Sequence, residues 1–294
     1  MPPTRATTPD GVVLALHDLG GEGQPALLVH ATGFHGRVLS PLARRLGLAF
    51  HCLALDLRGH GRSEVAPDLD FDWVGFGTDV LTAVDAFGLE GAVGIGHSCG
   101  GAALLLAEEA RPGAFSTLYC FEPVVFPADY LPMPNPSEQL ARGARLRREI
   151  FASRQEAHAN YASKPPLNVL DPEVLAAYVE FGFEDLADGT VRLLCRGENE
   201  ARIYESGLRH PAFSRLARVD CPVVVACGSL SDGFNPASME HLEDGFNPAS
   251  MEHLVGNLAK ASLEVLPELG HFGPLEQPAV VADSVIRALE PPSA

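Results

Sequence analysis

The fold is decided by the stretch Gly94-Ile95-Gly96-His97-Ser98-Cys99-Gly100-Gly101, which follows an apolar run and opens a helical one. Within it, residues 96–100 match the G-x-S-x-G pattern of a nucleophile elbow, a tight turn that joins a strand to a helix. Glycine is needed on both sides of Ser98, because a Cβ there would collide with the neighbouring strand or helix. The turn exposes the Ser98 hydroxyl and places the next backbone N–H at a helix N-terminus, where negative charge is stabilised.

Short apolar runs alternate with helical stretches on both sides of this motif. The runs are apolar throughout, which is typical of parallel strands covered on both faces. Strands interleaved with helices predict an α/β fold with a mostly parallel central sheet flanked by helices. Ahead of them, the turn signal Pro9-Asp10-Gly11 predicts an opening hairpin. The runs are residues 26–30, 50–55, 92–96, 116–121, 222–227 and 262–266, and the helical stretches include 79–87, 101–111 and 278–289.

Residues 127–216 interrupt this alternation with proline-rich stretches and helical patterns at 137–161 and 172–183. We expect them to form a helical cap inserted after the sixth strand and lying over the sheet. Residues 1–126 and 217–294 would then form the core domain. Arginines interleaved with glutamates in the cap indicate a solvated helix face; they are Arg142, Arg145, Arg147, Arg148 and Arg154.

The chain is acidic, with 21 Lys+Arg against 38 Asp+Glu and a formal net charge of −17. Such a charge repels phosphate backbones and anionic lipid surfaces, which argues against nucleic acid or a membrane as a partner. No apolar run approaches the roughly 18 residues of a membrane helix. The first ten residues lack the apolar core of a signal peptide. We therefore expect a cytoplasmic protein.

Cysteine and histidine spacing gives no indication of a metal site. No pair of the six cysteines has CxxC spacing, and the eleven histidines are scattered. We expect the thiols to be reduced and buried like small hydrophobic side chains. We expect no metal and no cofactor.

The chain resembles the α/β-hydrolase fold superfamily, in particular its serine-nucleophile members with a helical cap. Besides the elbow, the marks of this resemblance are residues 27–34 after the third strand, 55–63 after the fourth, and 269–278 near the C-terminus. Together, in this order, they are specific to the superfamily but not to one substrate. The resemblance implies that His271 is the general base, which takes the Ser98 proton and returns it to the leaving group.

The loop His30-Ala31-Thr32-Gly33-Phe34 matches the family's oxyanion loop, with Ala31 where the family usually has glycine. The resemblance implies that the backbone N–H groups of Thr32 and Cys99 bind the oxyanion. The departure at Ala31 leaves open whether Thr32, Gly33 or Phe34 gives the first amide. By the same analogy, two further charged residues brace loops beside the pocket; they are Asp56 and Arg58.

The acid that completes the triad has three candidates. Asp232 follows strand seven in a stretch that resembles the family's G-x-x-D-x-x-x-P, with one extra residue between Gly228 and the aspartate. Glu122 ends strand six, as the acid does in some relatives. Asp244 begins the second copy of an eleven-residue duplication, in which residues 232–242 recur as 244–254. The short path from the strand favours Asp232, because a catalytic carboxylate needs a rigid anchor.

These motifs predict a serine hydrolase that cleaves carboxylic esters or lactones and is independent of cofactors. Two alternatives remain: a perhydrolase or haloperoxidase-like oxidoreductase with the same triad, and a non-hydrolytic small-molecule-binding member of the fold. Aromatic residues in and next to the cap indicate an apolar or aromatic substrate group, or else the cap's own core. They are Phe126, Tyr130, Phe151, Tyr161, Tyr178, Phe181 and Phe183.

Overall fold

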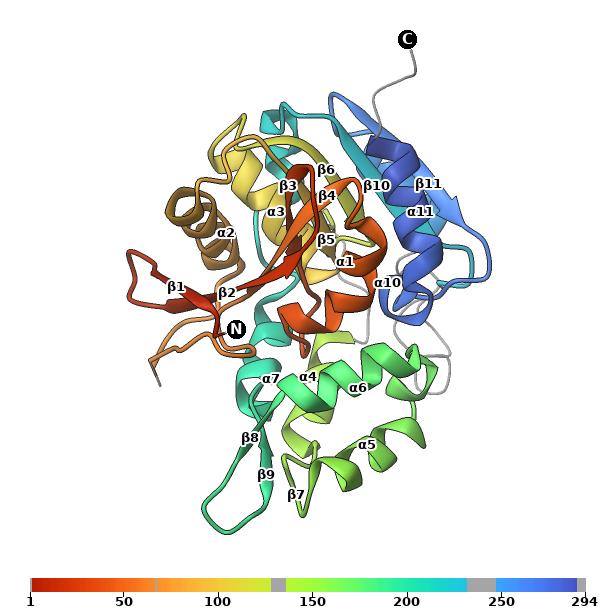
Figure 1. The fold of residues 1–294 in the computed structure, drawn as a ribbon. Helices are drawn as coiled ribbons and strands as arrows, with labels where there is room; N and C mark the ends of the chain where they lie inside the picture. Colours follow the sequence, from red (N-terminus) through yellow and green to blue (C-terminus); the bar gives the residue numbers. More distant parts are fainter. Residues whose placement is uncertain (1, 67, 128–135, 232–246, 290–294) are drawn as a thin grey trace.

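The computed structural model describes the chain except residues 1, 67, 128–135, 232–246 and 290–294, and an eight-stranded sheet lies at its centre (Figure 1). The strand order is β1-β2-β4-β3-β5-β6-β10-β11. β1 pairs antiparallel with β2, β2 pairs antiparallel with β4, and the remaining pairs are parallel. The predicted opening hairpin and the mostly parallel sheet are confirmed. The strands are β1 (Thr4–Thr7), β2 (Val13–Gly20), β3 (Gln24–Val29), β4 (Phe50–Asp56), β5 (Ala92–His97), β6 (Phe115–Phe121), β10 (Val223–Gly228) and β11 (Ala261–Leu266).

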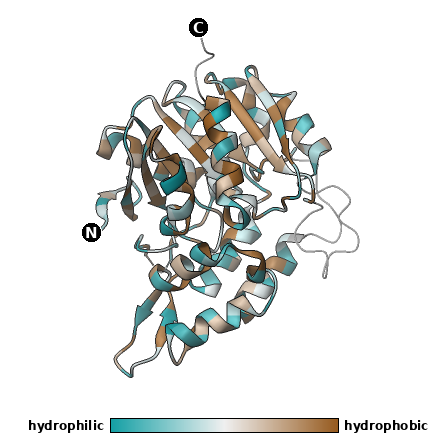
Figure 2. Cartoon of the chain, turned by 45° about the vertical axis from the view of Figure 1, so that its right-hand side comes forward, coloured by the Kyte–Doolittle hydropathy of each residue, from teal (hydrophilic) through white to brown (hydrophobic). Residues whose placement is uncertain are grey.

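Both faces of the sheet are buried, as the uniformly apolar runs predict. In β3, Leu27 and Val29 pack into the core that contains α2 (Trp73–Phe87) and α3 (Cys99–Ala110). The alternate residues of β3 pack into a second core on the opposite face, with α1 (Ser40–Leu46) and α11 (Pro278–Leu289). Successive side chains of a strand point to opposite faces, so a strand between two cores must be apolar at every position. Figure 2 shows the hydrophobic colouring concentrated on these central strands.

The helices of the core agree with the sequence except at some ends. Helix α11 has the predicted bounds, and α3 begins two residues earlier than predicted, directly after Ser98. Helix α2 begins at Trp73 rather than at residue 79, because the Asp72 side chain accepts a hydrogen bond from the Val74 amide and caps the helix. None of the described helices is long and apolar enough to cross a bilayer.

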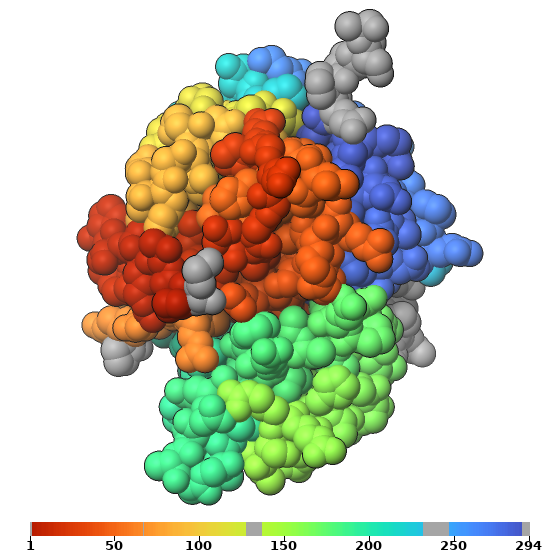
Figure 3. Space-filling model, viewed as in Figure 1, coloured from red at the N-terminus to blue at the C-terminus, as the bar shows by residue number. Residues whose placement is uncertain are grey.

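The elements between β6 and β10, residues 136–218, are called the cap segment here. Its first helices and its strands form the lower lobe in Figures 1 and 3, whereas Ala212 and Leu216 near its end pack into the core on the α3 side of the sheet. Its helices are α4 (Pro136–Leu146), α5 (Arg154–Ala162), α6 (Pro172–Phe181), α7 (Gly197–Ser206) and α8 (Ala212–Arg215), and its strands are β7 (Ile150–Phe151), β8 (Phe183–Asp185) and β9 (Val191–Leu193).

The cap segment is not purely helical, which corrects the prediction. Its three strands form an antiparallel sheet in the order β7-β9-β8. β7 interrupts the helical pattern predicted over residues 137–161, which is divided between α4 and α5. Strands of two or three residues are too short to show a periodic pattern, so the sequence gives no signal for them.

The duplicated sequence is described only in its second copy. The first copy, residues 232–242, lies outside the described residues, as do residues 244–246. The rest of the second copy forms α9 (Pro248–Val255), whose N-terminus is capped by the Asn247 side chain. Met251 and Leu254 of this helix are buried in the core on the α3 side of the sheet. The second copy therefore contributes a structural helix between β10 and β11.

Candidate active site

Ser98 lies at the turn between β5 and α3 with φ 55° and ψ −115°, a backbone conformation that non-glycine residues rarely adopt. The glycines around it are sterically required. A Cβ at Gly96 would lie 2.7 Å from the Gly100 carbonyl, and a Cβ at Gly100 would lie 2.2 Å from the Val29 carbonyl oxygen. The Ser98 amide donates to the Phe121 carbonyl at 2.9 Å, which ties the turn to β6. The predicted strand–turn–helix setting of Ser98 is present.

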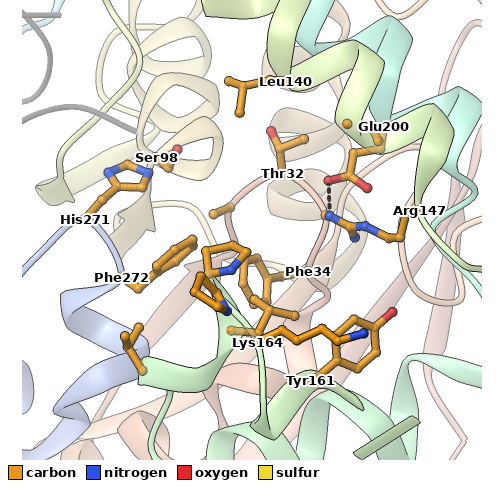
Figure 4. A pocket seen from close by; sticks show the side chains of 18 of the residues that line it. Thr32, Phe34, Ser98, Leu140, Arg147, Tyr161, Lys164, Glu200, His271 and Phe272 are labelled. Atoms are coloured by element: carbon orange, nitrogen blue, oxygen red, sulfur yellow. Dashed lines mark hydrogen bonds and ion pairs between the residues drawn. The ribbon is translucent and has the colours of Figure 1, made fainter. Parts of the chain in front are cut away.

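His271 is placed by the loop between β11 and α10 (Gly273–Glu276). Its backbone carbonyl accepts a hydrogen bond from His97 Nε2 at 2.7 Å, so the residue that precedes Ser98 fixes this loop. Ser98 and His271 line the same cavity, and Figure 4 shows their side chains next to one another. The tertiary structure thus brings the predicted nucleophile and the predicted base together.

Glu122 provides the carboxylate beside His271. Its Oε2 lies 2.6 Å from His271 Nδ1, and its side chain is fully buried. Oε1 accepts hydrogen bonds from the Gly228 amide and the Ser231 hydroxyl. Glu122 has φ 44°, and its own amide donates to the Ala226 carbonyl of β10 at 2.8 Å. The carboxylate is therefore held at Oε1 by the end of β10 and the residues after it, and at Oε2 by His271 in the loop after β11.

This geometry changes the order of the three candidate acids. The sequence favours Asp232, but the carboxylate at Nδ1 of His271 is that of Glu122. Asp232 and Asp244 lie outside the described residues. The reason lies in the sheet: β6 and β10 are neighbours, so a residue at the end of β6 reaches the loop that follows β10. The sequence signal for Glu122 was the extra residue after Gly228. It puts Ser231 at the third position after Gly228, where the G-x-x-D pattern has its aspartate, and this serine donates to Glu122.

The oxyanion loop follows β3, and two of its three candidate amides already have acceptors. The Gly33 amide donates to His60 Nε2 at 3.0 Å, and the Phe34 amide donates to the Ala31 carbonyl at 3.2 Å. Thr32 lines the cavity beside Ser98. Cys99 opens α3, where backbone amides favour a negative charge. Because the Gly33 and Phe34 amides already have acceptors, the Thr32 amide is the one of the three that can donate to a substrate oxygen.

Two buried histidines fix this loop in their neutral form. His30 Nδ1 donates to the Ala31 carbonyl, while Nε2 accepts from the Leu57 amide. His60 Nδ1 donates to the Arg58 carbonyl, while Nε2 accepts from the Gly33 amide. Burial lowers the pKa of His30 to about 3 and that of His60 to about 4. A protonated ring would lose its acceptor nitrogen, so these bonds require neutral imidazole.

Asp56 and Arg58 brace the neighbouring loops, as the resemblance implies. Asp56 accepts hydrogen bonds from the Gly36 and Arg62 amides, and His17 Nε2 lies 2.8 Å from Oδ2. Burial by itself would raise the pKa of Asp56, but the His17 hydrogen bond and the charge interactions with His17, His35 and His30 together outweigh it and hold the pKa well below its usual range. The Arg58 guanidinium pairs with two carboxylates, which are those of Asp79 and Asp10.

The cavity has a volume of about 890 Å³ and is lined by residues of the core and of the cap segment. Figure 4 shows Ser98 and His271 on one side, Arg147 and Glu200 on the other, and Thr32 between them. The arginine-rich stretch of the cap is not wholly a solvated face, because Arg147 lines this cavity and is only 26% exposed. Composition and spacing give no signal for this, since Arg147 resembles its exposed neighbours in sequence.

The aromatic residues of the cap divide between two roles. Phe151 and Phe183 are buried against one another, with ring centroids 5.8 Å apart, and belong to the cap's own core. Tyr161 and Tyr178 belong to the same ring cluster but also line the cavity. Tyr130 lies outside the described residues. The rings therefore form part of the cap's own core, and two of them also line the cavity.

Within the described residues, no group of three or more His, Cys, Asp or Glu side chains could hold a metal ion. All six cysteines are buried and unpaired with one another. Burial raises the pKa of the Cys99 thiol, next to Ser98, to about 12. This thiol is therefore protonated at neutral pH and is a poor nucleophile.

Comparison with known proteins gives one family match. The model of a family described as "Alpha/beta hydrolase family" matches residues 26–284. A bifunctional esterase/perhydrolase from Acinetobacter calcoaceticus is 37% identical over 101 residues, 32% of this chain and 35% of that protein. N-formylmaleamate deformylase from Pseudomonas putida is 34% identical over 95 residues, 32% of this chain and 35% of that protein. The chain thus matches about a third of the length of these relatives.

Among solved structures, E-2-(acetamidomethylene)succinate hydrolase aligns over 97% of both chains with a TM-score of 0.81 and 19% identity. At that identity the likeness concerns the fold alone.

Proposed function

Because the chain belongs to the alpha/beta hydrolase family, we propose that it is a cofactor-independent serine hydrolase that cleaves a carboxylic ester or lactone through an acyl-enzyme. Ser98 is the nucleophile, His271 the general base and Glu122 the acid. One observation carries the proposal: a buried carboxylate lies 2.6 Å from Nδ1 of a histidine that shares a cavity with the elbow serine.

The acylation step follows from the hydrogen bonds of His271. Glu122 accepts the Nδ1 proton of His271, which leaves Nε2 as the basic nitrogen. Nε2 takes the Ser98 proton while the hydroxyl oxygen attacks the carbonyl carbon of the ester. The imidazolium that forms is stabilised by the Glu122 carboxylate, and its Nε2 proton passes to the departing alkoxide.

The oxyanion of the tetrahedral intermediate is bound by the backbone amides of Thr32 and Cys99. Losing one such donor typically costs about 10²–10³ in rate. Water then attacks the acyl-enzyme, with His271 again acting as base, and Ser98 is released. All steps use groups of this chain and one water molecule.

Two measurements test the proposal. The release of 4-nitrophenol from 4-nitrophenyl butyrate is followed in the wild type and in Ser98→Ala, and a fluorophosphonate probe is used to label the protein. We expect turnover and labelling that maps to Ser98 by mass spectrometry. Turnover equal in the two proteins, or label on another residue, would refute the assignment of Ser98.

A perhydrolase activity is the second candidate, because one relative is named a bifunctional esterase/perhydrolase. In that reaction hydrogen peroxide replaces water at the acyl-enzyme and a peracid leaves. Bromination of monochlorodimedone in acetate buffer with peroxide reports it. Halogenation that depends on Ser98, with no ester turnover, would favour this candidate over the hydrolase.

A further inference from the structure

A buried ion pair lies across the cavity from Ser98. Arg147 Nη2 donates to Glu200 Oε1 at 2.8 Å, and the side chains are 26% and 1% exposed respectively. The pair packs against the oxyanion loop, because a Cβ at Gly33 would lie 2.7 Å from Glu200 Oε1. Figure 4 shows the pair on the opposite side of Thr32 from Ser98. It is therefore close to the place where the scissile carbonyl must lie.

Three buried polar atoms lie around this pair: the hydroxyls of Tyr161 and Tyr178 and the second carboxylate oxygen of Glu200. The two hydroxyls interact with one another, and no other described residue gives either of them, or the glutamate oxygen, a hydrogen-bond partner. The two tyrosine rings are in edge-to-face contact, with centroids 5.4 Å apart. Buried polar groups without a partner are uncommon in native proteins, and each needs an explanation. A ligand carboxylate can accept hydrogen bonds from the tyrosine hydroxyls, whereas Glu200 Oε2 is itself an acceptor and needs a donor such as a water molecule.

The charges in the cavity differ in sign from the charge of the whole chain. The net charge of −17 repels anions. The cavity nevertheless contains three cationic side chains, Arg142, Arg147 and Lys164, against the carboxylates of Glu200 and Glu276. Glu200 is paired with Arg147, and Glu276 accepts the Gly270 amide. Burial also raises the pKa of Glu276 and so disfavours its charged form.

From these contacts we infer that the substrate carries a carboxylate away from its scissile bond, and that Arg147, held in place by Glu200, binds it. This inference rests on the proposed ester hydrolysis and names its substrate class. An arginine fork matches a carboxylate geometrically, and partial desolvation strengthens such bonds. Arg147 uses Nη2 for its bond to Glu200, and this bond orients the guanidinium. The side chain lines the cavity, so the other N–H donors of the guanidinium are available to a ligand there.

Matched pairs of esters give the test. One pair carries the charge on the acyl side: 4-nitrophenyl hydrogen adipate and its methyl ester. The other carries it on the alcohol side: 4-acetoxyphenylacetate and its methyl ester. We expect kcat/KM for the charged member of one pair to exceed that for its neutral partner by about tenfold or more, as for a hydrogen bond to a charged group. Rates in Ser98→Ala are subtracted.

Variants of the ion pair separate binding from a merely structural role. In Arg147→Gln the preference, which is the ratio of kcat/KM for the charged ester to that for the neutral ester, should disappear. In Glu200→Gln the preference should increase, because the amide oxygen still accepts from Arg147 and keeps it in place, while the negative charge that repels a substrate carboxylate is gone. The double variant Arg147→Gln/Glu200→Gln removes both charges. It takes the place of Arg147→Gln in the test if that single variant, which leaves the buried Glu200 carboxylate unpaired, fails to fold.

Arg145→Gln is the matched control. Arg145 also joins α4 to α7, through Glu198 and Glu205, but it does not line the cavity. Its variant should keep the full preference for the charged ester. A preference that persists in Arg147→Gln or in the double variant, or no preference in either ester pair, would overturn the inference. If no ester is turned over above the Ser98→Ala rate, the proposed hydrolysis itself fails.

Discussion

Oε2 of Glu122 lies 2.6 Å from Nδ1 of His271, although 149 residues separate the two along the chain. Glu122 directly follows β6, and its backbone is in the left-handed region. His271 lies in the loop that follows β11. Strand β10 lies between β6 and β11, and its end supplies the Gly228 amide that fixes the other carboxylate oxygen. Three strands that are neighbours in the sheet thus determine one hydrogen bond at its carboxyl edge.

Replacing the elbow serine tests the nucleophile and the strain together. We expect Ser98→Ala to lose esterase activity by at least about a thousandfold, as triad serines typically do. Because Ser98 has φ 55°, Ser98→Gly should unfold at a higher temperature than Ser98→Ala, by the equivalent of about 1 kcal/mol. Thermal unfolding of the two inactive proteins measures this. Equal melting temperatures would contradict the strained turn.

Replacing the three candidate acids in turn tests the assignment of Glu122. Glu122→Gln keeps the shape of the side chain but cannot stabilise the imidazolium, so kcat should fall by about 10²–10⁴. Asp232→Asn and Asp244→Asn should stay within about threefold of the wild type. Pre-steady-state rates with 4-nitrophenyl butyrate give the comparison. A crippled Asp232→Asn beside an active Glu122→Gln would return the role to the loop after β10.

The duplicated segment predicts a tolerated deletion. Removing residues 232–243 leaves the second copy in place, with Asn247 to cap α9 and with Met251 and Leu254 to fill the core. Asp244 then directly follows Ser231, in the place of Asp232, and Glu122 and His271 are unchanged. We expect esterase activity within about threefold of the wild type, because no triad contact among the described residues is lost. Deleting residues 232–255, which removes both copies, is the control, and it should destabilise the protein, since the buried apolar side chains of α9 are then lost.

Two glycines provide a matched pair for the elbow. A Cβ at Gly100 would lie 2.2 Å from the Val29 carbonyl oxygen, whereas one at Gly143 in α4 would meet no atom within 4 Å. Gly100→Ala should therefore destabilise the fold strongly, by about 3 kcal/mol or more. Gly143→Ala should be neutral or stabilising by up to about 1 kcal/mol, since alanine is the better helix former. Urea unfolding at neutral pH reports both values.

The neutral histidines beneath the oxyanion loop predict an acid-sensitive stability. Their folded-state pKa values, about 3 for His30 and about 4 for His60, lie below the ordinary histidine value of 6.5. Between these values the unfolded chain binds more protons, so the free energy of unfolding falls as the pH falls below about 6.5. Each histidine contributes a slope of about 1 kcal/mol per pH unit.

His60→Asn tests this linkage by urea unfolding at several pH values. The amide of asparagine does not titrate in this range, so the variant should lose less stability than the wild type between pH 7 and pH 5. His51→Asn is the control, because His51 is 40% exposed and pairs only with the surface residue Asp18. An identical pH dependence in the wild type and His60→Asn would contradict the buried neutral state.

The sequence by itself determined the sheet and the elbow, and the family resemblance indicated the histidine that shares a cavity with Ser98. A uniformly apolar run must be covered on both faces, and the glycines around Ser98 admit one local conformation. Both features therefore depend only on residues that are close together in the sequence. The same holds for the opening hairpin and for α11. Local signals failed where elements are short: β7, β8 and β9 have two or three residues each, too few for any period to appear.

Only the tertiary structure decided which acid faces His271 and which arginine pairs with Glu200 at the cavity. Counting along the chain favours Asp232, but the contact depends on β6 lying beside β10, which sequence distance does not encode. Likewise Arg147 and Arg145 are indistinguishable in their stretch of sequence, yet the pairing of α4 with α7 buries one beside Glu200 and leaves the other at the surface. Long-range packing selects among chemically equivalent side chains, and that selection made the site.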